Sequence, residues 1–126
     1  MHHSRFCEVV IDCNTYELDA AAAFWSGALG RPVNLEKSGD PRLYRLLEGP
    51  SGEIRVEVQR VDHASRVHID IETDDIPAEV TRLVKLGARV AKRMPRWVVM
   101  QAPTGQRFCV VGAQSAEFPQ NANTWG

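Results

Sequence analysis

Ionisable side chains recur at every second position in several strand-like runs of this sequence. Glu8 and Asp12 flank Val10 in the first run, and His68 and Asp70 open a second run with the same spacing. Successive side chains of a strand point to opposite faces, so each set is expected on one side of its strand. The full set on these faces is Glu8, Val10, Asp12, Arg55, Glu57, Gln59, His68, Asp70, Glu72, Arg107 and Cys109.

These residue types could bind a divalent metal. Imidazole nitrogen, carboxylate oxygen and thiolate sulfur are ligands for such ions when they converge within about 2.0 to 2.3 Å of one point. Spacing does not establish convergence, because a sheet with one solvated face shows the same alternation. A metal site and a solvated outer face are therefore both compatible with the pattern. His68 has a further alternative, a hydrogen bond to a neighbour such as Glu57 or Asp70.

The elements that carry these residues are repeated along the chain. Residues 10–33 and 67–90 each contain an apolar strand, a helix-length segment, a Leu-Gly stop and a second strand. Such a unit cannot bury its own apolar face, so two units must pack together or pair with another chain. In the second unit we expect Ile69 and Ile71 under the helix, with His68 on the opposite side of the strand.

Apolar periodicity predicts an α+β fold, in which two tandem βαβββ modules form a curved mixed-sheet shell around a central cavity. The modules span about residues 6–60 and 67–112 of a single domain, residues 1–126, with a joint at 61–66 and an irregular tail at 113–126. Further strands are expected at about 33–37, 43–47, 53–60, 88–92, 97–101 and 106–111, with helices at about 17–29 and between Asp74 and Gly87.

The composition is that of an ordinary soluble protein. The 126 residues are 44% hydrophobic and 25% charged, with a formal net charge of -1. This balance gives no electrostatic reason to bind nucleic acid or an anionic membrane, and no run approaches the roughly 20 apolar residues of a membrane span. We see no signal peptide, and Cys7, Cys13 and Cys109 lack metal-finger spacing, so reduced thiols in the cytoplasm are expected. His2 and His3 are expected in a disordered terminus.

Several short motifs point to one known superfamily. They are Phe24-Trp25 before Leu29-Gly30, Val67-His68-Ile69-Asp70 with Asp74-Asp75, Leu86-Gly87-Ala88, and Ala102-Pro103-Thr104-Gly105 before Arg107-Phe108-Cys109-Val110. In these motifs the chain resembles the vicinal oxygen chelate superfamily, which includes glyoxalase I, extradiol dioxygenases, fosfomycin-resistance enzymes and bleomycin-binding proteins. More narrowly, it is similar to the small glyoxalase-like domains of actinobacteria, over about residues 6–112.

The resemblance implies a set of metal ligands, because each half of a metal-dependent member supplies one ligand from its first strand and one from its last. On this chain the positions are Glu8 and Glu57 in the first half, and His68 and Cys109 in the second. Cys109 stands where glutamate is usual, and Glu8 where histidine or glutamine is usual. Val10 competes with Glu8 for the place that corresponds to His68. The implied cofactor is a divalent metal (Zn, Mn, Fe or Ni) or none, and a thiolate would favour Zn.

Two functions are compatible with the resemblance. One is a metal-assisted lyase, isomerase or dioxygenase that acts on a small oxygenated metabolite, with Glu57 as a general base. The other is a metal-free protein that binds or sequesters a small molecule, like the bleomycin-resistance relatives. Trp97 and Met100 are expected to line the pocket, and Arg55 and Arg107 to bind an anionic group. The resemblance also implies a homodimer.

Overall fold

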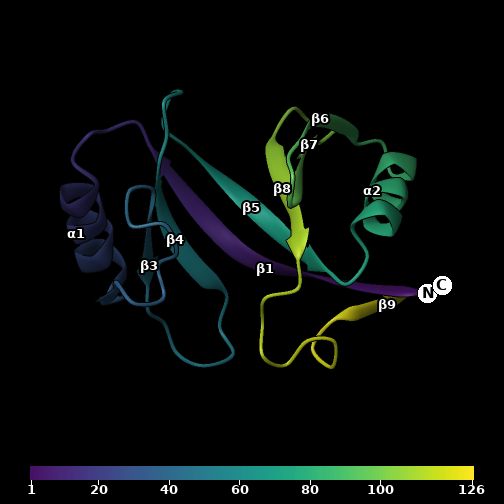
Figure 1. Cartoon of the computed structure of the whole chain (residues 1–126), viewed down its shortest axis with the longest axis horizontal. Helices are drawn as coiled ribbons and strands as arrows, with labels where there is room; N and C mark the ends of the chain where they lie inside the picture. Colours follow the sequence, from purple (N-terminus) through teal and green to yellow (C-terminus); the bar gives the residue numbers. More distant parts are fainter. The chain divides into compact units, whose positions relative to one another are not determined.

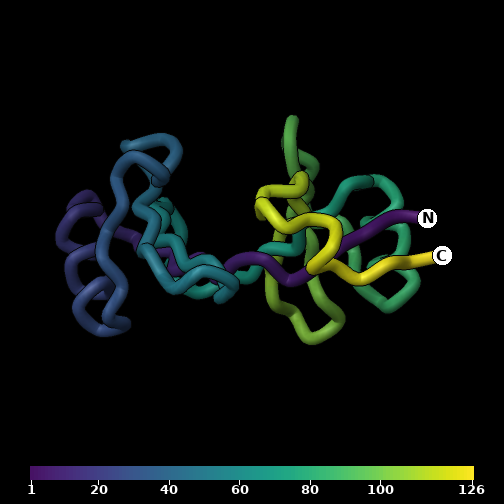
Figure 2. Tube along the Cα trace, turned by 90° about the horizontal axis from the view of Figure 1, so that it is seen from below, coloured from purple at the N-terminus to yellow at the C-terminus, as the bar shows by residue number.

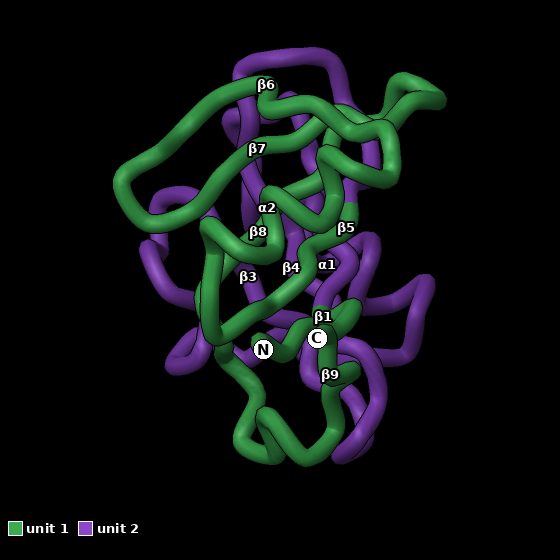
Figure 3. Tube along the Cα trace, turned by 90° about the vertical axis from the view of Figure 1, so that its right-hand side faces the viewer, with its two compact units in different colours: residues 1–7, 69–126 green, residues 8–68 purple.

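The chain forms two compact units whose boundary lies inside two of its strands. A computed structural model describes residues 1–126. Unit 1 consists of residues 1–7 and 69–126, and unit 2 of residues 8–68 (Figure 3). Strands β1 (His2–Cys13) and β5 (Arg66–Thr73) each contribute residues to both units. The division therefore falls within β1 and β5.

Unit 2 is a four-stranded sheet with one helix. It contains the second part of β1, α1 (Leu18–Leu29), β2 (Val33–Asn34), β3 (Tyr44–Leu47) and β4 (Arg55–Arg60). Strand β3 pairs antiparallel with both β2 and β4, and β4 pairs parallel with β1. Helix α1 lies beside β3 and β4, at the left of Figure 1. The sheet of this unit is therefore mixed.

The core of unit 2 follows from strand alternation. Val56 and Val58 of β4 and Ile11 of β1 pack with Leu18 of α1 and Leu47 of β3. Neighbouring positions on the same strands must then point to the other side of the sheet, away from α1. Those neighbours include Asp12 of β1 and Glu57 of β4, so the face away from α1 carries charged side chains.

Unit 1 has the same strand, helix and three-strand order. After β5 come α2 (Ile76–Lys85), β6 (Arg89–Arg93), β7 (Trp97–Gln101), β8 (Arg107–Gly112) and the short strand β9 (Asn123–Trp125). Strand β7 pairs antiparallel with β6 and β8, and β8 pairs parallel with β5. Figure 1 shows α2 beside this sheet, where its Val80 and Leu83 pack with Met100, Phe108 and Val110. Asp75 caps the helix, because its side chain accepts a hydrogen bond from the Ala78 amide.

These features confirm the predicted α+β class, the mixed sheet and the repeated element order. The packing of β5 differs from the prediction. Ile71 packs against the core of unit 1 as expected, but Ile69 remains 41% exposed. The apolar stripe of β5 is thus buried only beyond Ile69. Neither helix has the length and apolar content needed to cross a membrane.

The ends of the chain correct two further expectations. Strand β1 begins at His2, so His2 and His3 are not in a disordered terminus. The tail at 113–126 is not wholly irregular, because β9 pairs antiparallel with residues 2–4 of β1. Figure 2 shows the two chain ends side by side. The sequence did not predict β9, because a three-residue strand has no periodicity of its own and depends on a distant partner strand.

Two buried glutamates of unit 1 form hydrogen bonds with residues near the two ends of the chain. Glu79 Oε1 lies 2.8 Å from His2 Nε2, and both Glu79 oxygens accept hydrogen bonds from Arg82, at 2.9 and 2.7 Å. The Arg82 guanidinium lies 4.0 Å from the centre of the Trp125 ring, and the Trp125 indole donates to Ser4 Oγ. The second glutamate, Glu72, accepts from the amides of residues 114 and 115 and from the hydroxyl of residue 115.

Candidate functional site

The polar face of unit 2 brings several predicted site residues together. Glu8 of β1 is the register partner of Arg55 of β4, and Val10 is the partner of Glu57. Arg55 and Glu57 are two positions apart on one strand, so their side chains share a face with those of Glu8 and Val10. This face is opposite to the one that α1 covers. The alternation seen in the sequence therefore predicts correctly which of these side chains share a face.

Arg55 contacts both of the acidic residues on this face. Its Nη2 donates hydrogen bonds to Glu57 Oε1 at 3.0 Å and to the Lys37 carbonyl oxygen at 3.1 Å. Its Nε lies 3.4 Å from Glu8 Oε1. The side chain of Glu8 is only 4% exposed and that of Glu57 12%. The two carboxylates expected to bind a metal thus hold a guanidinium.

A second charged group on unit 2 consists of Asp12, His68 and Arg66. His68 Nδ1 lies 2.7 Å from Asp12 Oδ2, and Arg66 Nε lies 3.8 Å from the same oxygen. Asp12 is buried, and its other oxygen, Oδ1, has no hydrogen-bond partner. When Nδ1 donates to the carboxylate, the lone pair of His68 lies on Nε2. His68 thus hydrogen-bonds a neighbouring carboxylate, although this partner, Asp12, was not one of the two neighbours expected.

Two further residues complete the polar face. Tyr44 of β3 and Gln59 of β4 are register partners, and the Gln59 amide donates a hydrogen bond to Tyr44 Oη at 3.2 Å. Trp25 of α1 packs against the core of unit 2. Burial and the charge of the nearby Asp12 raise the pKa of the Cys13 thiol.

In unit 1 the sheet face away from α2 is less charged. Cys109 of β8 is the register partner of Asp70 on β5 and of Val99 on β7, and Trp97 pairs with Val111. Cys109 and Trp97 are half-buried, whereas Arg107 at the start of β8 is exposed. His68 precedes Asp70 by two positions on β5. Asp70 and Cys109 place a carboxylate and a thiol, two donor types for a metal ion, on adjacent strands of unit 1.

Met100 does not lie where the pocket was expected. It is fully buried in the core of unit 1, where it packs with Val80, Phe108 and Val110. Trp97 and Met100 are three positions apart on β7, so alternation places their side chains on opposite faces. Of these two expected pocket residues, only Trp97 lies on the face away from α2.

The donor atoms allow a test of the predicted metal ligands. A divalent ion bound by Glu8 and Glu57 would have to displace the guanidinium of Arg55, with which both carboxylates are already paired. These two residues therefore do not fit a metal as the chain stands. Cys109 of unit 1, another of the ligands that the resemblance implies, offers a thiolate, which would favour zinc.

Sequence reasoning named Asp12 as part of the polar face but did not give it or Arg66 a role in the site. Asp12 could have been identified from the sequence, because it lies an even number of positions from Glu8 and so shares its face of the strand. No signal pointed to the carbonyl of Lys37, because a loop places that group.

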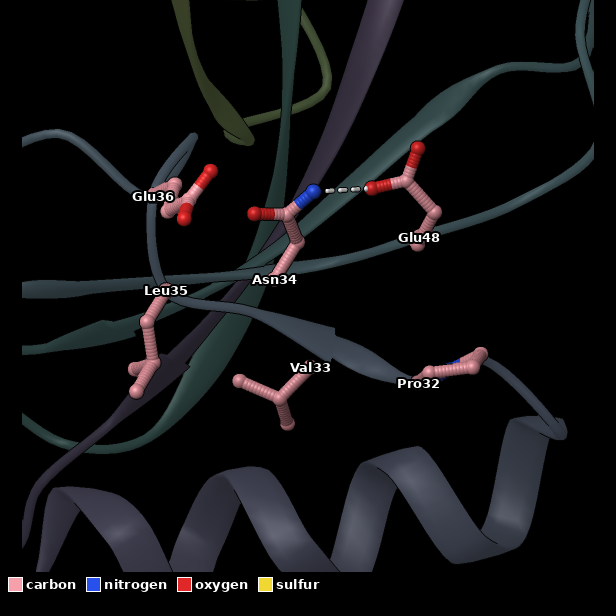
Figure 4. Close-up of a pocket in the computed structure, with 6 residues that line it drawn as sticks. All are labelled: Pro32, Val33, Asn34, Leu35, Glu36 and Glu48. Carbon is pink, nitrogen blue, oxygen red and sulfur yellow. Dashed lines mark hydrogen bonds between the residues drawn. The ribbon is translucent and has the colours of Figure 1, made fainter.

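A shallow groove lies elsewhere on unit 2. It has a volume of about 500 Å³ and is lined by Pro32, Val33, Asn34, Leu35, Glu36 and Glu48. Figure 4 shows the hydrogen bond that the Asn34 amide donates to Glu48 Oε2 at 2.6 Å. None of the predicted site residues lines this groove, so it is separate from the polar face.

Comparison with known proteins identifies the family. A family model described as a glyoxalase-like domain matches residues 8–111. The chain belongs to this family. It is thereby a member of the vicinal oxygen chelate superfamily, as the sequence motifs indicated. No curated protein matches the chain.

Solved structures share the glyoxalase-like fold at low identity. Methylmalonyl-CoA epimerase from Mycobacterium tuberculosis is 17% identical, with a TM-score of 0.61 over 87% of this chain and 88% of that one. A methylmalonyl-CoA epimerase in complex with methylmalonyl-CoA and NH4+ is 20% identical, with a TM-score of 0.62 over 93% and 99% of the two chains. A hypothetical protein from Bacillus halodurans C-125 is 13% identical, with a TM-score of 0.62 over 89% and 96%. At these identities the likeness shows a common fold.

Proposed function

We propose that this glyoxalase-like chain binds a small oxygenated molecule on the polar face of unit 2, and that Glu8 and Glu57 do not act as metal ligands there. The observation that carries the proposal is the position of Arg55, which pairs with both carboxylates. A guanidinium has five N–H donors and is always charged at physiological pH. It neutralises the carboxylates and presents hydrogen-bond donors to a ligand.

The exposed parts of this face suit a ligand that carries oxygen atoms. The side chains of Arg55 and Arg66 are 39% and 49% exposed, while the acids beneath them are buried. Arginine binds carboxylate and other anionic oxygens in a planar, bidentate geometry. Asp12 Oδ1, which is buried without a hydrogen-bond partner, could accept one from a hydroxyl group.

Trp97 and Arg107 remain proposed binding residues on unit 1. The half-buried indole of Trp97 offers an apolar surface, and the exposed Arg107 offers a positive charge. We also retain the homodimer as a prediction, which light scattering at working concentration would check.

Metal analysis and a ligand screen test this proposal together. Protein purified without chelator or added metal should contain far less than one equivalent of any transition metal. A small carboxylate or hydroxylated compound that raises the Tm of the wild type should lose this effect in Arg66→Gln. Arg45→Gln is the matched control, because Arg45 pairs with the exposed Asp19 and not with the polar face. Stoichiometric metal, or a ligand shift unaffected by Arg66→Gln, would contradict the proposal.

A metal-assisted isomerase is the second candidate, with a lyase or dioxygenase as its variants. The resemblance implies His68 and Cys109 as metal ligands, and two of the structures with the same fold are methylmalonyl-CoA epimerases, so isomerisation is the first reaction to consider. A bound metal would act as a Lewis acid toward substrate oxygens, and Glu57 would serve as the base once released from Arg55. This candidate predicts bound metal that is lost in His68→Ala, together with turnover of methylmalonyl-CoA by the metal-loaded protein.

A further inference from the structure

We infer that unit 1 binds a small molecule through a phosphate or diphosphate group, on the sheet face that points away from α2. The site consists of Arg89, Lys92 and Arg107. This inference assigns a class of ligand to Arg107, which rests on the binding role proposed for that residue, and it does not depend on the polar face of unit 2.

Basic residues are segregated from acidic ones in this part of the chain. Residues 80–116 contain no aspartate or glutamate, although the whole chain has 16 acidic and 15 basic residues. The basic residues of this segment are Arg82, Lys85, Arg89, Lys92, Arg93, Arg96 and Arg107. Charges of either sign protect an edge strand such as β6 from pairing with another chain. That role does not explain a single sign, nor does it explain Arg107, because β8 is paired on both sides.

The arginines of this segment also differ from the others in their partners. Those with a carboxylate oxygen within 3.8 Å are Arg5, Arg31, Arg42, Arg45, Arg55, Arg60, Arg66 and Arg82. The remaining ones, Arg89, Arg93, Arg96 and Arg107, form no ion pair with a carboxylate. Arg89 Nη2 donates instead to the neutral Gln101 Oε1, at 3.0 Å. The positive charge of this region is thus not compensated within the protein, and an anion from solution would compensate it.

The register of the sheet places three of the basic side chains on one face. Arg89 of β6, Gln101 of β7 and Arg107 of β8 are successive register partners and form one row across the sheet. Lys92 pairs with Val99, which lies two positions from Gln101 on β7. The register shifts just before Lys92, and this irregularity brings Lys92 onto the face of Arg89 although the two are three positions apart.

This face is open because α2 covers the other one. Met100 and Phe108 alternate with the residues of these rows and pack in the core with α2. The three basic side chains, in contrast, are exposed. The carboxylates of the same face are Asp70 and Glu72, which are buried and lie on β5. The face therefore presents cations to solvent on β6 and β8, and its acids are withdrawn from solvent on β5.

The spacing of the three cations suits a phosphorylated ligand. Adjacent strands lie about 4.8 Å apart, and residues on one face repeat about every 6.8 Å along a strand, so the three side chains originate about 7 to 12 Å from one another. Their length lets them converge on a group bound between them. A phosphate carries up to two charges and directs its oxygens to several sides, whereas a carboxylate has one charge and is planar. Donors that approach from three positions therefore favour phosphate.

The test is a calorimetric titration of the full chain with pyrophosphate in metal-free buffer of low ionic strength. The wild type should show saturable binding that weakens as salt is added. Arg89→Gln and Arg107→Gln should each weaken this binding by about tenfold, because each removes a charge-assisted hydrogen bond. Arg93→Gln is the matched control. Arg93 is an exposed arginine of the same strand, but its register partner is the buried Val98, so it lies on the face toward α2. This control should change the affinity by less than about twofold.

Two other anions make the inference specific. Citrate should bind at least about tenfold more weakly than pyrophosphate, because its charges are on planar carboxylates. Absence of saturable binding by the wild type, equal binding of citrate, or equal losses in Arg93→Gln and Arg89→Gln would each overturn the inference. A single-stranded oligonucleotide that binds more tightly than pyrophosphate would also overturn it and assign the face to nucleic acid. None of these results bears on unit 2, whose proposed site is tested separately by Arg66→Gln.

The Tm of each variant without ligand checks that it folds. All three substitutions are at exposed positions and should leave the Tm within about 2 °C of the wild type. Arg107→Lys provides a second measurement, since it keeps the charge but not the bidentate donor geometry. Its affinity for pyrophosphate should lie between those of the wild type and Arg107→Gln, and an affinity as low as that of Arg107→Gln would contradict a role for the charge.

Discussion

Both units bury carboxylates, but they surround them differently. In unit 1, Glu79 and Glu72 accept hydrogen bonds from the helix and from segments at the two chain ends. In unit 2, Glu8 and Asp12 lie on an open sheet face, where their partners are partly exposed side chains, and one oxygen of Asp12 has no hydrogen-bond partner. Burial alone therefore does not distinguish a carboxylate that binds a ligand from one that stabilises the fold. The extent of hydrogen bonding separates carboxylates that hold the fold from those that could meet a ligand.

The largest expected effect is on the stability carried by Glu79. Glu79→Ala leaves His2 and Arg82 without their shared partner and should lower the free energy of unfolding by about 3 kcal/mol. Chemical denaturation measures this change. Glu53→Ala is the control, because Glu53 is more than half exposed and lies 3.7 Å from Arg31; it should change the stability by no more than about 0.5 kcal/mol. Equal losses in the two variants would show that Glu79 has no special structural role.

The same carboxylate should make stability fall in acid. Burial raises the pKa of Glu79, but hydrogen bonds from Arg82, His2 and Ser4 outweigh it and hold the pKa below its ordinary value of 4.5. The unfolded chain then binds the proton more readily, so the stabilisation is complete above that ordinary value and is lost as pH falls through the lower folded value. Unfolding measured from neutral to acid pH should show this slope, and Glu79→Gln should reduce it. An unchanged slope in Glu79→Gln would assign the acid sensitivity to other groups.

The smallest expected effect on stability is at Asp12. Asp12→Asn keeps an oxygen that can accept from His68 but removes a buried charge, so the free energy of unfolding should change by less than about 1 kcal/mol. The ligand-induced rise in Tm should be lost at the same time. Thermal shift with and without ligand measures both results. A loss of stability as large as that in Glu79→Ala would place Asp12 with the structural carboxylates of unit 1.

Local patterns were sufficient to predict most of the fold. Alternation along β1 and β4 gives the correct buried face, because Ile11, Val56 and Val58 form the core of unit 2. The strand β7 has the predicted bounds, Trp97–Gln101. The pairing of β9 with β1 could not be predicted, since it joins residues more than a hundred positions apart that have no periodic signal.

The candidate site was predictable in its residues but not in its chemistry. The alternation of side chains along each strand predicts that Glu8, Arg55 and Glu57 share one face, and the register of β1 with β4 agrees. Whether two carboxylates hold a metal or an arginine depends on where a flexible side chain settles, and spacing does not contain that information. Met100 was misplaced for a simpler reason, because it was assigned to the pocket together with Trp97 although their positions on β7 have opposite parity.

The boundary inside β1 and β5 has a consequence for how this sequence can change over generations. A break in the polar loop before β5 would leave residues 66–68, which belong to unit 2, on the same fragment as most of unit 1. Likewise, the first seven residues belong to unit 1 but precede all of unit 2. Recombination that exchanges one repeat for another must therefore carry foreign strand segments into the remaining half.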